Sequence, residues 1–244
     1  MRIARCCAGD PLPAPTTPRW PPKCWPIGAL RRRKSCFISR QPSLGKAAAA
    51  YLGLMLSLQL TPFTELRTPR LLLRELREAD APTLFIMRSD ARFIRYLDRD
   101  PDASVDETLA IIRRIAQNTA DNAGITWAIV RPDRPDELLG TVGLWRMMPE
   151  KHRAEIGYGL HSDHWGQGLM HEALAAVLDY GFQSLHLHSV EANVNPSNAA
   201  SIRALEKQGF VREAHFREDY YFRGQFLDSV IYSLLTPLRP GSPA

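Results

Sequence analysis

The stretch that decides the fold is IGYGLHSDHWGQGLMHEA, residues 156–173. A strand-like run ends at Leu160, a short loop holds Gly166 and Gly168, and a helical pattern follows at once. The first turn of a helix presents unpaired N–H groups and the positive end of the helix dipole, and glycine lets the backbone approach a phosphate closely. This order predicts a site for the pyrophosphate of a cofactor. Two glycines alone also suit any tight strand-to-helix connection, so the loop by itself leaves a structural role open.

Two common phosphate-binding motifs do not match this loop. A P-loop needs Gly-Lys-Ser/Thr at its end, whereas Leu169 follows Gly168 here. A dinucleotide-binding fold needs a third glycine and an acid after the next strand. Glu191 has a suitable spacing for that acid. Ala173 follows where close helix packing is expected, but the rest of the G-x-G-x-x-G pattern is absent, and too little chain remains for further βαβ units.

Working outward from the loop, the apolar periodicity and turn residues predict short, alternating elements. Ser104 and Glu107 form a capping box before an apolar helical stripe, and Asp80 is placed to cap a shorter helix toward Arg88. Pro196 fits the first turn of a late helix that stops at Gly209. The predicted strands are 70–76, 126–131, 138–147, 153–160, 190–194, 211–216 and 225–235, and the longer helices are 104–119 and 168–183. The order βααβββαβαββ indicates an α+β (α/β-like) fold, with a mixed sheet flanked by helices.

The front of the chain has a different composition. Residues 1–46 hold eight of the nineteen prolines, all four cysteines, and ten Lys and Arg against one acid. Such a segment buries too little apolar surface to order itself. We therefore predict a disordered extension over 1–60, one domain over 61–237 and a tail over 238–244. Met55 is an alternative start.

The net charge and the positions of the cysteines indicate which partners and which cellular compartment to expect. Residues 1–46 carry +9 and the whole chain +5, so residues 47–244 carry −4. Because the domain has no basic stripe, we predict no nucleic-acid or membrane partner. The apolar run 47–60 is shorter than the roughly 20 residues that a membrane span needs, and it lacks a signal-peptide cleavage site. A cysteine-free domain fits the cytoplasm.

Four segments together resemble the GNAT superfamily of N-acetyltransferases, specifically its ribosomal-protein N-terminal (Rim-type) branch, across residues 63–235. They are TPRLLLREL (68–76), AEIGYGL (154–160), HWGQGLMHEAL (164–174) and ANVNPSNAASIRALEKQGF (192–210). The resemblance implies the GNAT fold, acetyl-CoA as acyl donor, and direct transfer of acetyl to a primary amine. The implied acceptor is a protein N-terminus. A small amine such as a polyamine or an antibiotic, a non-catalytic acyl-CoA-binding module, and a homodimer all remain open.

The same resemblance implies which residues contact the cofactor. Met170 stands where the loop often has a small residue, which leaves the backbone contacts available. Asn198 would contact the pantetheine arm or a water molecule. The implied cofactor-binding residues are Leu160, Trp165, Gly166, Gln167, Gly168, Leu169, Met170, His171, Asn193 and Asn198.

Acetyl transfer to an amine needs a base for the amine and an acid for the leaving thiolate. Glu155 is the first candidate base, acting through water, and Glu172 is the second. Both carboxylates also have ordinary structural explanations, on a strand and in a first helical turn. Many superfamily members have a tyrosine acid where Leu205 stands here, so Ser201 is the candidate acid, with protonation by solvent as the alternative.

Histidines are numerous around the motif but do not complete a metal site. No cysteine or suitably spaced acid joins them in a ligand set, so we predict no metal. The five residues concerned are His161, His164, His171, His186 and His188.

Overall fold

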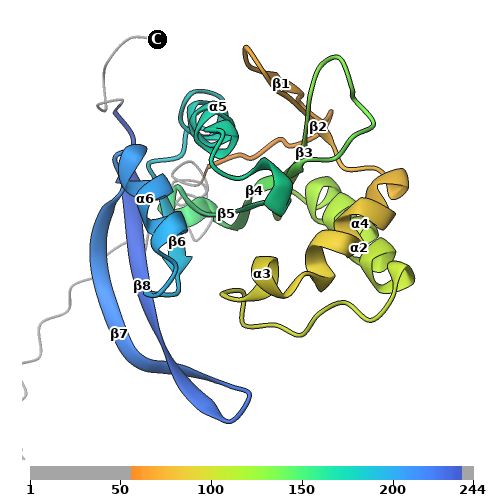
Figure 1. The fold of residues 1–244 in the computed structure, drawn as a ribbon. Helices are drawn as coiled ribbons and strands as arrows, with labels where there is room; N and C mark the ends of the chain where they lie inside the picture. Colours follow the sequence, from red (N-terminus) through yellow and green to blue (C-terminus); the bar gives the residue numbers. More distant parts are fainter. Residues whose placement is uncertain (1–55, 238–244) are drawn as a thin grey trace, which may run out of the picture. The chain divides into compact units, whose positions relative to one another are not determined.

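The computed structural model describes residues 56–237, which form one mixed sheet with helices on both faces (Figure 1). The helices are α2 (Ala81–Ser89), α3 (Ala91–Ile94), α4 (Val105–Ala120), α5 (Leu169–Gln183) and α6 (Ala199–Lys207). The strands are β1 (Leu66–Arg67), β2 (Leu72–Glu75), β3 (Ile125–Val130), β4 (Gly140–Met148), β5 (Arg153–Leu160), β6 (Ser189–Val194), β7 (Val211–Phe222) and β8 (Gln225–Leu235). Their order in the sheet is β1-β2-β3-β4-β5-β6-β8-β7, and β5 and β6 form the parallel pair among antiparallel neighbours.

Strand periodicity builds two cores, one on each face of the sheet. In β3, Trp127 and Ile129 pack in the core beneath α5, while Ala128 and Val130 pack beneath α2 and α4. Successive side chains of a strand point to opposite faces, so a run that is apolar at every position is buried on both sides. Figure 1 shows α5 on one side of the strands and α2 with α4 on the other.

The predicted fold class and the order of the main elements are confirmed, and the structure adds β1 and α3. Among the predicted helix starts, the one that differs most from the structure is that of the late helix, α6. It begins at Ala199 rather than at Pro196, because the Asn198 side chain caps it by accepting a hydrogen bond from the Ser201 N–H (3.1 Å). In α4, Ile112 is buried as expected, but Ala116 is exposed and Thr119 is buried instead.

Asp80 does not cap α2 through its side chain, contrary to the prediction. Its carboxylate accepts hydrogen bonds from the Arg77 N–H (2.7 Å) and from the buried Arg74 guanidinium (2.7 and 2.8 Å). Arg74 is 1% exposed, so its charge needs this partner inside the fold. The carboxylate therefore closes the turn before α2 and neutralises a buried cation.

The terminal hairpin is longer than predicted. The polar and aromatic residues 217–222, expected as a link, extend β7 as far as Phe222, after a register shift between Phe216 and Tyr220. The turn is at Arg223 and Gly224 as expected, with φ of 47° and 82°. Two positive φ values match the tight hairpin turn that suits the twist of paired strands.

The packed part of the chain begins before residue 61, where the predicted domain started. Leu60 is fully buried, and its N–H donates to the Asn122 side chain (2.8 Å). The Leu56 N–H donates to the Pro149 carbonyl (3.1 Å), and its side chain packs against the core. Met55, the rest of the predicted extension and the tail 238–244 lie outside the described residues.

Candidate active site

The two parallel strands separate in the middle of the sheet. β5 and β6 pair only from Arg153 with Ser189 to Glu155 with Glu191. Beyond that point β5 continues along β4 to Leu160, and β6 continues along β8 to Val194. The two strands therefore diverge, and the backbone groups on their facing edges are left for another partner.

A cavity of about 790 Å³ lies against the part of β5 that has separated from β6. Its walls come from α3 and the residues after it, the end of β5, the loop before α5, the start of α5, and the segment from Asn198 through α6. Its volume is within the range of roughly 300–1,000 Å³ typical of small-molecule sites. The divergence of the strands thus coincides with a space large enough for a cofactor and a reacting group.

The loop after β5 forms part of the cavity wall. The Trp165 indole N–H donates to the Leu160 carbonyl (2.8 Å), which fixes the start of the loop. Gly166 and Gly168 both have φ of +75°, and a Cβ at Gly166 would meet no atom within 4 Å. Glycine is therefore required at Gly166 by the backbone conformation and not by crowding. Gly168 caps α5 without a side chain, so the first N–H groups of α5 have no side-chain acceptor.

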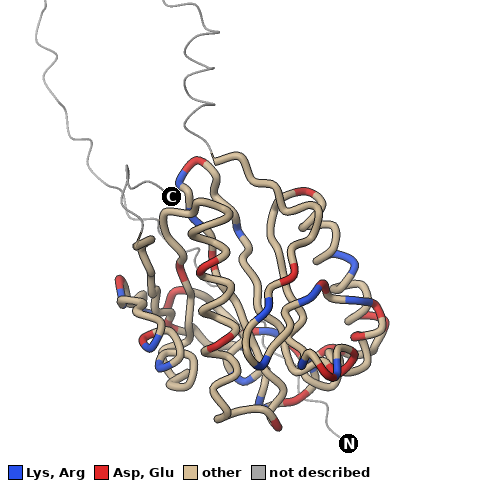
Figure 2. Tube along the Cα trace, turned by 90° about the horizontal axis from the view of Figure 1, so that it is seen from above, with Lys and Arg blue, Asp and Glu red and all other residues tan. Residues whose placement is uncertain are grey.

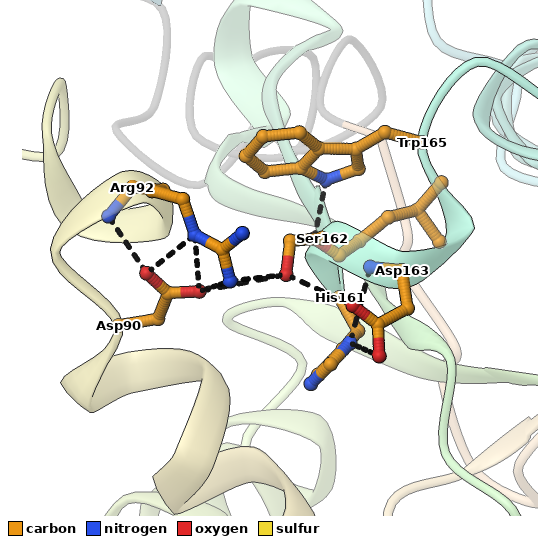
Figure 3. A network of polar contacts seen from close by, with 7 residues as sticks. Asp90, Arg92, His161, Ser162, Asp163 and Trp165 are labelled. Carbon is orange, nitrogen blue, oxygen red and sulfur yellow. Dashed lines mark hydrogen bonds and ion pairs between the residues drawn. The ribbon is translucent and has the colours of Figure 1, made fainter.

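A polar network joins this loop to α3 (Figure 3). Asp90 caps α3 by accepting from the Arg92 N–H (2.8 Å), and its carboxylate pairs with the Arg92 guanidinium (2.7 Å). That guanidinium also donates to the Ser162 hydroxyl (2.8 Å). Hydrogen bonds from Arg92 lower the pKa of Asp90 to about 2. The sequence interpretation missed α3, although an aspartate before Ala91 is a capping signal.

Two hydroxyl groups meet inside the cavity. The Tyr158 hydroxyl lies 2.7 Å from the Ser201 hydroxyl oxygen, and both residues line the cavity. Burial raises the pKa of Tyr158 to about 12, against a smaller opposing effect of the bond with Ser201. Tyr158 therefore keeps its proton at neutral pH. The sequence interpretation did not single it out, although it stands within the quoted motif.

The structure brings most of the predicted cofactor-binding residues to this cavity. Those that line it are Leu160, Trp165, Gly166, Gly168, Leu169, Met170, His171 and Asn198. Gln167 and Asn193 do not line it. Gln167 donates to the Asp163 carbonyl (3.2 Å), and Asn193 is exposed on β6 opposite Ile231.

The two candidate bases lie outside the cavity wall. Glu155 is buried at the last pair before β5 and β6 separate, and its carboxylate accepts from Arg146 (2.8 Å). Glu172 accepts from the Thr68 hydroxyl (2.5 Å) and from the Arg70 backbone and guanidinium (2.9 and 2.6 Å). Burial raises the pKa of Glu172, but these hydrogen bonds outweigh it and hold the pKa below its usual value. Its contacts fasten the start of α5 to the segment before β2.

The charges lining the cavity suit an anionic ligand. Arg92, Arg95, Arg203 and Lys207 line it, and none of the described residues around it is an Asp or Glu. Along the whole described trace, by contrast, acidic and basic positions are interleaved (Figure 2). Cations, left-handed glycines and a helix N-terminus together fit the phosphates of CoA.

Residues 56–237 show neither a metal-binding cluster nor a membrane-spanning helix. In this range no group of three or more His, Cys, Asp or Glu side chains is arranged to hold a metal ion. Within the same residues, none of the helices has the length and apolar character to cross a bilayer.

Comparison with known proteins gives consistent matches. A family model described as an acetyltransferase (GNAT) domain matches residues 70–211. The uncharacterized N-acetyltransferase YoaA of Bacillus subtilis is 35% identical over 175 residues, covering 72% of this chain and 98% of that protein. The ribosomal protein uS5-alanine N-acetyltransferase of Escherichia coli is 35% identical over 86 residues, covering 35% of this chain and 44% of that protein.

A solved structure supports the same fold. The spermidine N-acetyltransferase from Vibrio cholerae, in complex with CoA and spermine, matches with a TM-score of 0.61 and 24% identity, covering 69% of this chain and 97% of that one. The chain thus belongs to the GNAT family of acetyltransferases, and it is an N-acetyltransferase that uses acetyl-CoA as acyl donor and an amine as acceptor.

Proposed function

We propose that the acceptor is the N-terminal α-amine of a protein, as in the Rim-type branch, and that the amine attacks the thioester directly. The observation that carries this proposal is that the described lining of the large cavity contains no carboxylate. A polyamine is a polycation, and the amines that do not react need anionic partners that this lining does not offer. A small amine without several positive charges is the alternative.

The pKa of the acceptor amine also favours a protein N-terminus as the acceptor. An α-amino group has a pKa of about 7.7–8.0, whereas a lysine-like alkyl amine has a pKa near 10.4. A protein N-terminus therefore supplies much more of the neutral, nucleophilic form near neutral pH. The only titratable side chains in the described lining are cationic or phenolic groups and the imidazoles of His164 and His171. A carboxylate base has to act from outside this lining through water, and an acceptor with a low amine pKa fits such a base best.

Acetyl-CoA supplies the activated acyl group, and the residues of the chain hold it and move protons. We propose that the backbone N–H groups from Trp165 to His171 bind its pyrophosphate. Ser201 donates a proton or a hydrogen bond to the departing thiolate, and the Tyr158 hydroxyl orients the Ser201 hydroxyl (2.7 Å). Glu155 accepts the amine proton through water from its position where the strands part. Glu172 has a positioning role, because Thr68 and Arg70 already engage its carboxylate.

The acceptor class is tested by CoA release from acetyl-CoA. Peptides with a free N-terminus are compared with the same peptides carrying a blocked N-terminus and with spermidine, and mass spectrometry locates the acetyl group. We expect acetylation at the α-amine of the free peptides and little turnover of spermidine. Efficient turnover of spermidine, with none of the free peptides, would refute the proposed acceptor.

The residue roles are tested in the same assay. General acid–base groups contribute roughly 10²–10⁴-fold, so Glu155→Gln should lower kcat by at least about 100-fold. The matched variant Arg146→Gln removes the same ion pair and should have a much smaller effect. Ser201→Ala should lower kcat by at least about tenfold, because a hydrogen bond to a charged group is worth about 1.5–3 kcal/mol. Equal losses in Glu155→Gln and Arg146→Gln would reduce Glu155 to a structural role. Cytoplasmic location and a homodimer stay predictions.

A further inference from the structure

A second cavity, of about 400 Å³, adjoins the first. The segment after α3, the link between β6 and α6, and the tip of the β7–β8 hairpin line it. The two cavities share Ala91, Arg95 and Tyr96. No described residue of the loop 161–168, of α5 or of α6 lines the second cavity, so it is separate from the elements that fit the phosphates of CoA.

The charged side chains that line this second cavity have polar partners among the described residues, with one exception. Arg99 pairs with Asp102, which Arg88 shares, and Arg223 pairs with Asp100. Over residues 56–237, the Arg95 side chain has neither an ion pair nor a hydrogen bond, and its guanidinium carbon lies 5.2 Å from the centre of the Tyr96 ring. Its donors are thus without a described acceptor at the wall shared by the two cavities.

No described acid forms an ion pair with Arg95. Asp98, the acid among the residues that line the second cavity, accepts a hydrogen bond from the Tyr220 hydroxyl instead. In the first cavity Arg92 is paired with Asp90, and the cations Arg203 and Lys207 belong to α6, beside the CoA loop. The donors of the Arg95 guanidinium are therefore open to a group that enters from the second cavity.

We propose that the second cavity receives the residues that follow the reacting amine, and that Arg95 binds a carboxylate there. A guanidinium presents a planar set of donors that matches a carboxylate, and an aromatic face beside it holds that plane. This inference rests on the proposed function. If Arg95 binds a carboxylate there, the preferred acceptor is a protein N-terminus with an Asp or Glu among its first residues.

The test compares peptides that differ at one position near the N-terminus, carrying Glu, Gln or Lys at residue 2 or residue 3. We expect wild-type kcat/KM to be about fivefold higher for Glu than for Gln, the size of a good exposed ion pair. Added salt should reduce the ratio, because partly exposed charges are screened. In Arg95→Gln the Glu/Gln ratio should fall to about one, and in Arg95→Glu the Lys peptide should become the better acceptor.

Arg114→Gln is the matched control, because Arg114 is an exposed arginine on α4 that lines neither cavity. It should keep the wild-type ratio. If peptides are acetylated but the Glu/Gln ratio is one, or if Arg95→Glu leaves the ratio unchanged, the inference about Arg95 is overturned while the proposed function stands. If no free peptide is acetylated, the proposed function itself fails.

Discussion

At the scale of single residues, the two candidate bases, Glu155 and Glu172, differ in how many hydrogen-bond partners their carboxylates have. Among the described residues, Glu172 is held by Thr68 and Arg70, and Glu155 by Arg146 alone. A carboxylate whose oxygens accept several hydrogen bonds is stabilised in its ionised form and is a weak base. This difference favours Glu155 over Glu172 as the group that receives the amine proton.

Glu172→Gln should lower the free energy of unfolding at pH 7 by about 1 kcal/mol, because it weakens charge-assisted hydrogen bonds to a partly exposed arginine. The folded-state pKa of Glu172 lies below its usual value of 4.5. Its contribution is therefore complete above pH 4.5 and is lost as the pH falls through the folded-state pKa. Urea unfolding at several pH values should show wild type and variant converging in acid. The exposed Glu150→Gln should match wild type throughout, and a pH-independent gap for Glu172→Gln would contradict this account.

At the scale of elements, α3 depends on its neighbours for its position. A helix of four residues cannot stabilise itself. The Asp90 cap and the network with Ser162 hold one side of it, and the Phe93 ring packs directly over Gly159 of β5. Because residues of α3 line both cavities, its placement sets the shape of the wall between them, where we propose that the acceptor binds.

Gly159→Ala should displace α3, because its Cβ would lie 2.6 Å from the Phe93 ring. Overpacking of this kind costs about 1–3 kcal/mol, and kcat/KM for the acceptor should fall by tenfold or more. Phe93→Ala should restore much of this loss in the double variant, a coupling that a double-mutant cycle measures.

Gly157→Ala provides the matched control for this pair. A Cβ there would lie 2.6 Å from the Trp145 ring instead, so Trp145→Ala should rescue it and Phe93→Ala should not. Rescue of both glycine variants by Phe93→Ala would show that the effect of Gly159→Ala is not steric contact with α3.

At the scale of the whole molecule, the packed core reaches toward the front of the chain. Removing residues 1–54 should leave stability and activity unchanged, whereas removing residues 1–60 should lower the free energy of unfolding by about 2 kcal/mol or more. The physical reason is the loss of the fully buried Leu60 side chain and of its backbone hydrogen bond to Asn122. Thermal unfolding and CoA release measure both effects. Leu60→Ala in the full chain is the control, and equal stability of the two truncated proteins would contradict this prediction.

The sequence by itself determined the features that depend on near neighbours. The Gly166 and Gly168 loop, the helical period of α5 and the left-handed stop at Gly209 are set by backbone conformation and side-chain spacing over a few residues. Local features of this kind, with the family resemblance, were sufficient to predict the fold class, and most of the residues predicted to contact the cofactor line the cavity. The start of α6 was misplaced because Asn198 competes with Pro196 for the cap through a side-chain hydrogen bond.

Only the tertiary structure decided which groups face one another across the site. Tyr158 and Ser201 lie 43 positions apart in the chain, and they meet because β5 and β6 pair over three residues and then diverge. The partners of Glu172, and the lack of a partner for the Arg95 side chain within residues 56–237, likewise depend on segments distant in sequence. Local periodicity records which face of a strand or helix is apolar. It carries no information on which polar group of another segment will stand opposite. The conformation of the Gly166 and Gly168 loop was therefore predictable, while the contact between Tyr158 and Ser201 and the surroundings of Arg95 were not.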